Sequence, residues 1–104
     1  FSAASSFTID TTPPPAPVLI SPANNIQMYK RPLFSWNKIS GATKYYIEID
    51  NNSDFSSPEW ASLKTETPHR VTFMRAGTYY WHVRARDTIG NWGSWSTTFT
   101  LIFR

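Results

Sequence analysis

Apolar and polar residues alternate in several short runs along this chain, and Gly, Pro, Asn and Ser separate the runs. A period of two is typical of half-buried β-strands, whereas an amphipathic helix repeats its apolar positions roughly every 3.6 residues. No segment keeps such a helical stripe over three turns. The pattern therefore predicts an all-β chain.

The clearest run covers residues 79–85. One face of it carries Tyr79, Trp81, Val83 and Ala85, and the other carries Tyr80, His82, Arg84 and Arg86. A second run follows Gly41 and places Tyr45, Ile47 and Ile49 on one face. Further strands are predicted around 18–20, 33–36, 60–63, 71–73 and 96–103, with a turn at 23–25. Seven short strands at this spacing indicate a two-sheet antiparallel β-sandwich.

The inward-facing positions of these strands predict an aromatic-rich core. The chain has 104 residues, enough for one domain, and 16% of them are aromatic. It contains no cysteine, so neither a disulfide scaffold nor thiol chemistry is expected. The predicted core consists of Phe34, Trp36, Tyr45, Ile47, Ile49, Val71, Phe73, Tyr79, Trp81, Val83 and Phe99.

Prolines mark a boundary near the start of the chain. Pro13, Pro14, Pro15 and Pro17 favour a stiff polyproline linker. Ser6-Phe7-Thr8-Ile9 resembles Thr98-Phe99-Thr100-Leu101, at an offset of 92 residues (99 − 7), about the length of one sandwich domain. Residues 1–12 are therefore interpreted as the remnant of a preceding module with its linker, and 13–104 as one domain.

Two segments resemble fibronectin type III domains. Gly77-Thr78-Tyr79, followed by Trp81, Val83 and Ala85, resembles the corner and strand F of those domains. Trp36, followed by Ser40-Gly41-Ala42-Thr43-Lys44-Tyr45, is similar to their B–C hairpin. The resemblance covers 13–104 and implies an immunoglobulin-like sandwich in which Tyr79 is the corner tyrosine, its hydroxyl bonded back to the chain.

The segment Trp92-Gly93-Ser94-Trp95-Ser96 is similar to the Trp-Ser-x-Trp-Ser box of cytokine-receptor modules, with Gly93 in place of the first serine. That resemblance implies that Arg84 and Arg86 interleave with the tryptophans through cation–π contacts. The Pro-rich entry and the missing cysteines look more like bacterial surface modules, so hormone binding is not inferred. Structural roles are expected for Trp36, Tyr45, Tyr79, Trp81, Arg84, Arg86, Trp92 and Trp95.

Candidate chemistry is sparse. Asp50, Asn52 and Asp54 have the spacing that begins a calcium loop, but Phe55 occupies the position where an EF-hand needs Gly, which favours Asx turns. His69 and His82 are expected to be surface histidines that face outward without further ligands. No nucleophile elbow and no Gly-rich phosphate loop occurs in the sequence. We therefore predict no enzyme, no cofactor and no metal site.

Charge and hydropathy restrict the classes of partner that we expect. The net charge is +3 with the basic residues scattered, which argues against nucleic-acid binding, and no stretch is long and apolar enough to span a membrane. The resemblance implies a monomeric spacer or adhesion module of a secreted or cell-surface protein, whose partners are neighbouring modules and protein or glycan ligands. The alternative is a carbohydrate-binding accessory module that uses exposed rings of Tyr46, Trp60, Tyr80 or Trp92.

Overall fold

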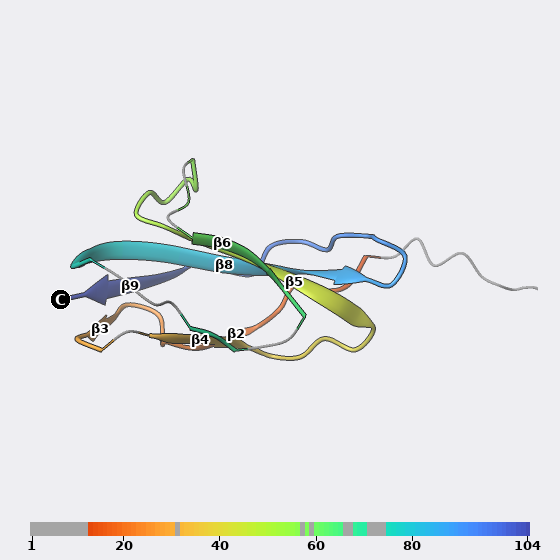
Figure 1. Ribbon diagram of the computed structural model, residues 1–104, viewed down its shortest axis with the longest axis horizontal. Helices are drawn as coiled ribbons and strands as arrows, with labels where there is room; N and C mark the ends of the chain where they lie inside the picture. Colours follow the sequence, from red (N-terminus) through yellow and green to blue (C-terminus); the bar gives the residue numbers. More distant parts are fainter. Residues whose placement is uncertain (1–12, 31, 57, 59, 66–67, 71–74) are drawn as a thin grey trace, which may run out of the picture.

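Two β-sheets face each other in the computed structural model, which describes residues 13–104 apart from 31, 57, 59, 66–67 and 71–74 (Figure 1). The first sheet has the strand order β2 (Leu19–Ser21), β4 (Leu33–Trp36), β7 (His69–Arg70). The second has the order β3 (Ile26–Met28), β9 (Phe99–Phe103), β8 (Gly77–Asp87), β5 (Ala42–Asp50), β6 (Trp60–Lys64). The described residues contain no helix, and the predicted all-β sandwich is confirmed.

The pairing of β5 with β8 forms the centre of the larger sheet. The two strands are antiparallel, with Ile47 opposite Val83 and Ile49 opposite Trp81. These residues are buried between the sheets, because side chains two positions apart share a face of a strand. The alternate pairs, which include Glu48 opposite His82, lie on the outer face of the sheet.

The core is built mainly from the residues that alternation predicted. Phe34 and Trp81 are fully buried and meet edge to face, with ring centroids 4.8 Å apart. Phe99 is partly buried against this cluster, whereas Val71 and Phe73 lie outside the described residues. Leu19, Ile39 and Leu101 add to the core without having been predicted. The predicted residues found buried are Phe34, Trp36, Tyr45, Ile47, Ile49, Tyr79, Trp81 and Val83.

Strand β3 was not predicted, because only three residues form it and they do not alternate in burial. It pairs in parallel with β9, so one strand pair departs from the antiparallel pattern. The predicted turn before it positions this pairing. There the backbone N–H of Asn25 donates to the Thr100 carbonyl at 2.7 Å, and the Thr100 N–H donates to Asn24 Oδ1 at 2.7 Å.

The last predicted strand begins later than expected, at Phe99 instead of Ser96. Ser96 nevertheless lies against β8, where its backbone N–H donates to the Val83 carbonyl at 2.8 Å. The N–H of Val83 donates to the Ser96 hydroxyl at 3.0 Å, so a side chain replaces the backbone carbonyl that a regular ladder would supply. This exchange interrupts the strand without exposing either polar group.

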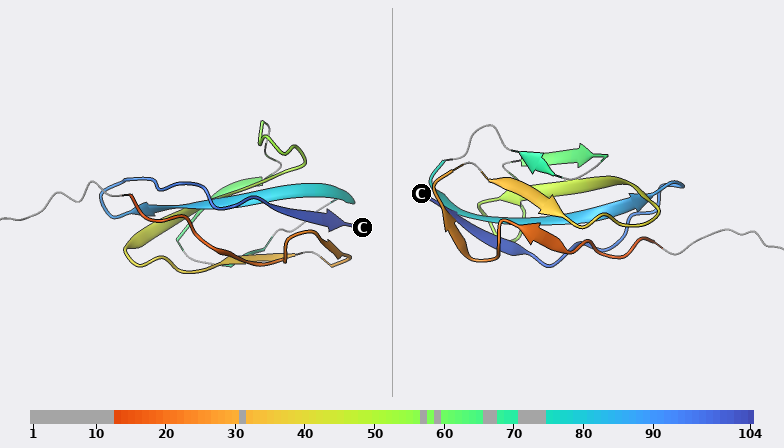
Figure 2. Two further views of the ribbon diagram at one scale, coloured as in Figure 1. Left: turned by 180° about the vertical axis from the view of Figure 1, so that it is seen from behind. Right: turned by 90° about the horizontal axis from the view of Figure 1, so that it is seen from below.

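The two ends of the described chain lie at opposite ends of the sandwich. The first residues (red) run beside the connection between β8 and β9, and the C-terminus lies at the far end, next to β3 (Figures 1 and 2). No part of the described chain forms a helix long and apolar enough to cross a membrane.

Candidate functional site

The residues expected to have structural roles fall into two groups, and the first lies in the core. Tyr79 donates its hydroxyl proton to the carbonyl of Arg75 at 2.7 Å, so its phenol is bonded to the chain just before β8. Tyr45 is also buried, and its hydroxyl accepts the backbone N–H of Ile39 at 2.9 Å. Both phenols thereby combine an apolar ring in the core with a satisfied hydroxyl.

The second group lies on the outer face of β8. The guanidinium carbon of Arg84 lies 4.6 Å from the ring centroid of Trp92 and 4.7 Å from that of Trp95. The guanidinium of Arg86 lies 5.7 Å from the Trp92 ring. Among the described residues, the buried Nε atoms of both arginines have no hydrogen-bond acceptor, so the indole faces are their main electrostatic partners.

The connection between β8 and β9 (residues 88–98) carries both tryptophans and folds back along β8. Trp92 forms an isolated bridge with Arg86, and the N–H of Gly93 donates to the Ala85 carbonyl at 2.8 Å. At its tip, Asp87 Oδ1 accepts the N–H groups of Ile89 at 3.1 Å and Asn91 at 2.8 Å. These hydrogen bonds, chiefly from Asn91, lower the pKa of the Asp87 carboxyl below its ordinary value.

His82 corrects one expectation, because it is not a surface histidine: only 8% of its area is exposed. Its ring lies parallel to Phe55 and to Trp95, with centroids 3.7 Å apart in both cases. Alternation along β8 places His82 on the outer face, as predicted, but other chain segments cover that face. Its Nε2 lies 2.8 Å from Glu48 Oε1 on the neighbouring strand.

The buried position of His82 affects its titration. Burial lowers the pKa of the imidazole below its ordinary value of 6.5, and the positive charge of Arg84 acts in the same direction. The hydrogen bond and the negative charge of Glu48 oppose this shift without cancelling it. The neutral imidazole is therefore the form that the folded protein favours.

Phe55 belongs to the loop after β5 (residues 51–56), the segment that was considered for calcium. Asp50 Oδ1 accepts the Asn52 N–H at 3.1 Å and Asp54 Oδ1 accepts the Ser56 N–H at 3.0 Å, as Asx turns do. Phe55 itself has a φ of 56°, a strained conformation for a bulky residue. The turns and the contact with His82 hold it there, a role that no pattern in the sequence indicated.

We define the outer stack as Phe55, His82, Trp95, Arg84 and Trp92. It alternates aromatic rings with a cation and an imidazole, and it joins the loop after β5 and the β8–β9 connection to one face of the sheet. Tyr46 packs against it, at 6.3 Å from Trp92 and 6.1 Å from Trp95.

The rings considered for sugar binding do not form a flat platform. Tyr46 is inclined by 72° to Trp92, and Trp92 also contacts two arginines. Trp60 packs at 56° against Tyr79 and is partly buried beside the core. Tyr80 is half-buried. Stacking on a sugar needs exposed ring faces, and these contacts leave few available.

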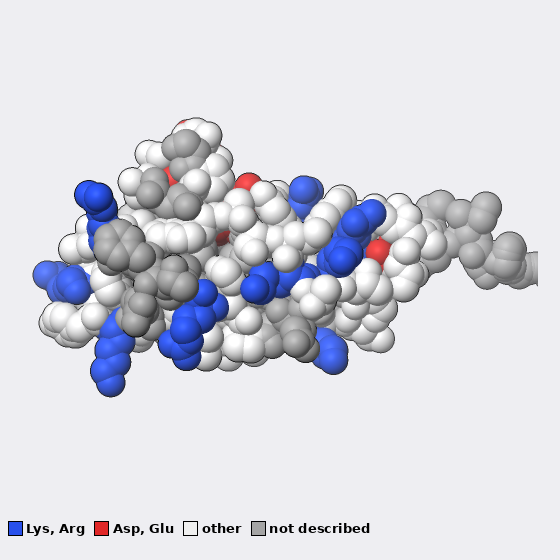
Figure 3. All heavy atoms as spheres, viewed as in Figure 1, with Lys and Arg blue, Asp and Glu red and all other residues white. Residues whose placement is uncertain are grey.

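Other candidate chemistry is dispersed. His69 is half-buried, and burial together with the positive charge of Lys64 lowers its pKa. No group of three metal-ligating side chains occurs in the described part of the chain. Figure 3 shows Lys and Arg side chains spread over one face of the molecule without a single dense patch.

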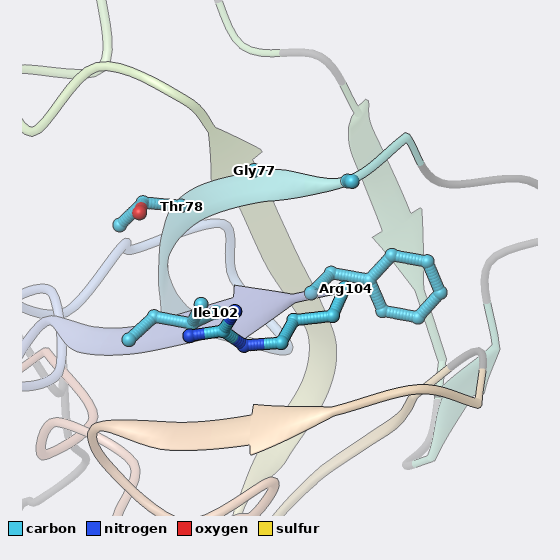
Figure 4. Close-up of a pocket in the computed structure, with 6 residues that line it drawn as sticks. Gly77, Thr78, Ile102 and Arg104 are labelled. Carbon is cyan, nitrogen blue, oxygen red and sulfur yellow. The ribbon is translucent and has the colours of Figure 1, made fainter.

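A hollow of about 540 Å³ lies at the C-terminal end of the sandwich, where β8 begins and β9 ends (Figure 4). Ala76, Gly77 and Thr78 line one side and Ile102, Phe103 and Arg104 the other. None of these six residues has an acidic or histidine side chain, so the lining offers no acid–base pair.

No family model matches the sequence, and no curated protein is similar enough to match. Solved structures do match, among them an Fn3-like protein from Clostridium thermocellum, 22% identical, with a TM-score of 0.57 over 88% of this chain and 91% of that one. An α-L-rhamnosidase from Streptomyces avermitilis, solved with L-rhamnose, is 19% identical with a TM-score of 0.63, and the match covers 88% of this chain and 10% of that one. The twitchin kinase region from C. elegans is 22% identical with a TM-score of 0.60, and the match covers 89% of this chain and 17% of that one.

The stack generates a prediction about stability. Arg84→Ala should lower the free energy of unfolding by about 1–2 kcal/mol, because its guanidinium lies over two partly desolvated indoles. Arg86→Ala should cost less, since one indole lies at a greater distance. Denaturant titrations measure both, and Arg70→Ala, which removes an exposed arginine of β7, is the control. Equal stability of the Arg84 and Arg70 variants would contradict the role of the stack.

The depressed pKa of His82 predicts a pH dependence. In the unfolded chain His82 takes up a proton near pH 6.5, whereas in the folded chain it does so only at lower pH. Its contribution to stability is therefore complete above pH 6.5 and declines as the pH falls from 6.5 toward the lower pKa of the folded state. Unfolding titrations between pH 7.5 and 5 should show this decline, reduced in His82→Gln. Because the pKa of His69 is also lowered, His69→Gln measures the separate contribution of that histidine to the same decline. Stability that rises on acidification would contradict the assignment.

Proposed function

We propose that this chain, which has the fold of fibronectin type III domains, is a non-catalytic module that spaces or joins its neighbours in a larger secreted or cell-surface protein. Domains of this fold occur as modules of multidomain proteins. In the rhamnosidase and the twitchin region, the matched part is only 10% and 17% of the chain. Neighbouring modules of the same chain are the partners that such a setting implies.

The arrangement of the chain ends carries the proposal. The described chain enters beside the β8–β9 connection and leaves at the opposite end of the sandwich (Figure 1). A domain with its ends at opposite poles adds its full length to a series of domains, whereas adjacent ends would place it as a side branch. This geometry suits a spacer.

The use of the polar and aromatic side chains supports a structural role. His82 is bonded to Glu48, lies between the rings of Phe55 and Trp95, and has only 8% of its area exposed, so its imidazole is largely covered. The arginines of β8 face indoles. Catalysis requires reactive groups that converge on an accessible cleft, and these groups converge on one another.

The repeat near the start of the chain extends the proposal to the preceding segment. If Phe7 corresponds to Phe99, then Thr12 corresponds to Arg104, and residues 1–12 belong to the end of a preceding module. Consecutive modules would then follow each other with a period of 92 residues (99 − 7). Pro13 to Pro17 would form the junction.

Carbohydrate binding is the weaker candidate. It would need two or more coplanar rings open to solvent, and the closest candidates, Tyr46 and Trp92, are inclined by 72°. The α-L-rhamnosidase was solved in complex with L-rhamnose, but the match covers only 10% of that chain.

The spacer proposal predicts an elongated particle. A chain in which two copies of residues 13–104 follow residues 1–12 should give a small-angle scattering profile of two modules held end to end. Replacing Pro13, Pro14, Pro15 and Pro17 with Ser should broaden the distance distribution, because both the fixed φ angles and the packing of Pro14 and Pro17 are lost. A parent chain that is already as flexible as the substituted one would refute the spacer mechanism.

A further inference from the structure

Gly93 stands where the similar Trp-Ser-x-Trp-Ser motif has a serine, and the structure supplies a reason. A Cβ atom built on Gly93 would lie 2.0 Å from the carbonyl oxygen of Pro14 and 3.0 Å from its carbonyl carbon. Real Cβ atoms essentially never approach another atom so closely. The backbone of the proline-rich segment therefore occupies the space that a side chain at position 93 would need.

The β8–β9 connection cannot easily move away to make room. The N–H of Gly93 donates to the Ala85 carbonyl at 2.8 Å, and the neighbouring Trp92 bridges to Arg86. The contact on the other side is also backbone, so no side chain can rotate to relieve it. Gly93 does not have a left-handed φ, so alanine would fit its backbone conformation and only the contact with Pro14 excludes it.

The proline-rich segment is packed against the sandwich beyond this contact. Burial alternates along it, with Pro13 and Pro15 exposed, Pro14 and Ala16 half-buried and Pro17 buried. At its end, the N–H of Asn37 donates to the Val18 carbonyl at 2.9 Å, and the N–H of Val18 donates to Asn37 Oδ1. The segment is thus held at two points, by Gly93 and by Asn37.

We propose that the β8–β9 connection is a docking surface for the proline-rich segment. Gly93 leaves the space that the backbone of this segment needs, and the docking fixes the direction in which the chain enters the domain. Polyproline stiffness alone would fix only the shape of the segment, whereas docking also fixes its orientation relative to both sheets. Where the chain is a spacer, as proposed above, any pivot between modules then lies before Pro14 instead of along the whole proline run.

The test uses the 104-residue chain itself and reads the backbone order of Ala16 by ¹⁵N relaxation, since prolines have no N–H. Docking predicts an Ala16 order parameter near that of Val83 in the sheet, roughly 0.85, in the parent chain. Gly93→Ala should lower it below roughly 0.6, the range of a flexible chain. Ser94→Ala, a change at the exposed neighbouring residue, should leave it unchanged.

A second variant separates docking from proline stiffness and does not threaten the fold. Pro13→Ser/Pro15→Ser changes only the two exposed prolines, so docking predicts an ordered Ala16, whereas polyproline stiffness predicts a mobile one. A mobile Ala16 in the parent chain or in this double variant overturns the proposal. An Ala16 that stays ordered in Gly93→Ala overturns it as well, because the hydrogen bonds between Val18 and Asn37 would then hold the segment without the contact at Gly93. Because a single module suffices, the result is independent of whether the spacer function is correct.

Discussion

The contact of Arg84 with Trp92 and Trp95 is the interaction on which the arrangement of the outer face depends. Arg84 is half-buried, and its buried Nε has no hydrogen-bond acceptor among the described residues. Two indole faces, at 4.6 and 4.7 Å from its guanidinium carbon, compensate part of this cost. The same Trp95 ring lies on His82, which lies on Phe55. One cation thus begins a series of ring contacts that crosses the face of β8.

These contacts determine how two irregular segments lie on the sheet. The loop at 51–56 contributes Phe55, and the β8–β9 connection contributes both tryptophans, although neither segment forms a regular strand there. Because the connection is held against β8, its backbone at Gly93 presents a fixed surface to Pro14. The path of the entering chain therefore depends on ring contacts on the outer face, as well as on the core between the sheets.

The sequence predicted those features that follow from alternation and missed those that depend on loops. A period of two suffices to place Trp81 inward and Arg84 outward, because each strand of a sandwich has one buried face. It cannot reveal that His82 is covered, since Phe55 reaches it from a loop with an unusual φ. Alternation also could not predict the three-residue β3, because its pairing with β9 depends on backbone contacts between distant segments. The close approach of Pro14 to Gly93 left one trace, a glycine in place of a serine, whose cause only the structure reveals.

Proton chemical shifts test the outer stack most directly, because aromatic rings shift the resonances of nuclei above their faces. The ring protons of His82 lie between Phe55 and Trp95, and the Arg84 side chain lies over two indoles. The account predicts that both sets of resonances are displaced strongly upfield in the folded protein and return to ordinary values on unfolding. Ordinary shifts for His82 and Arg84 in the folded protein would contradict it.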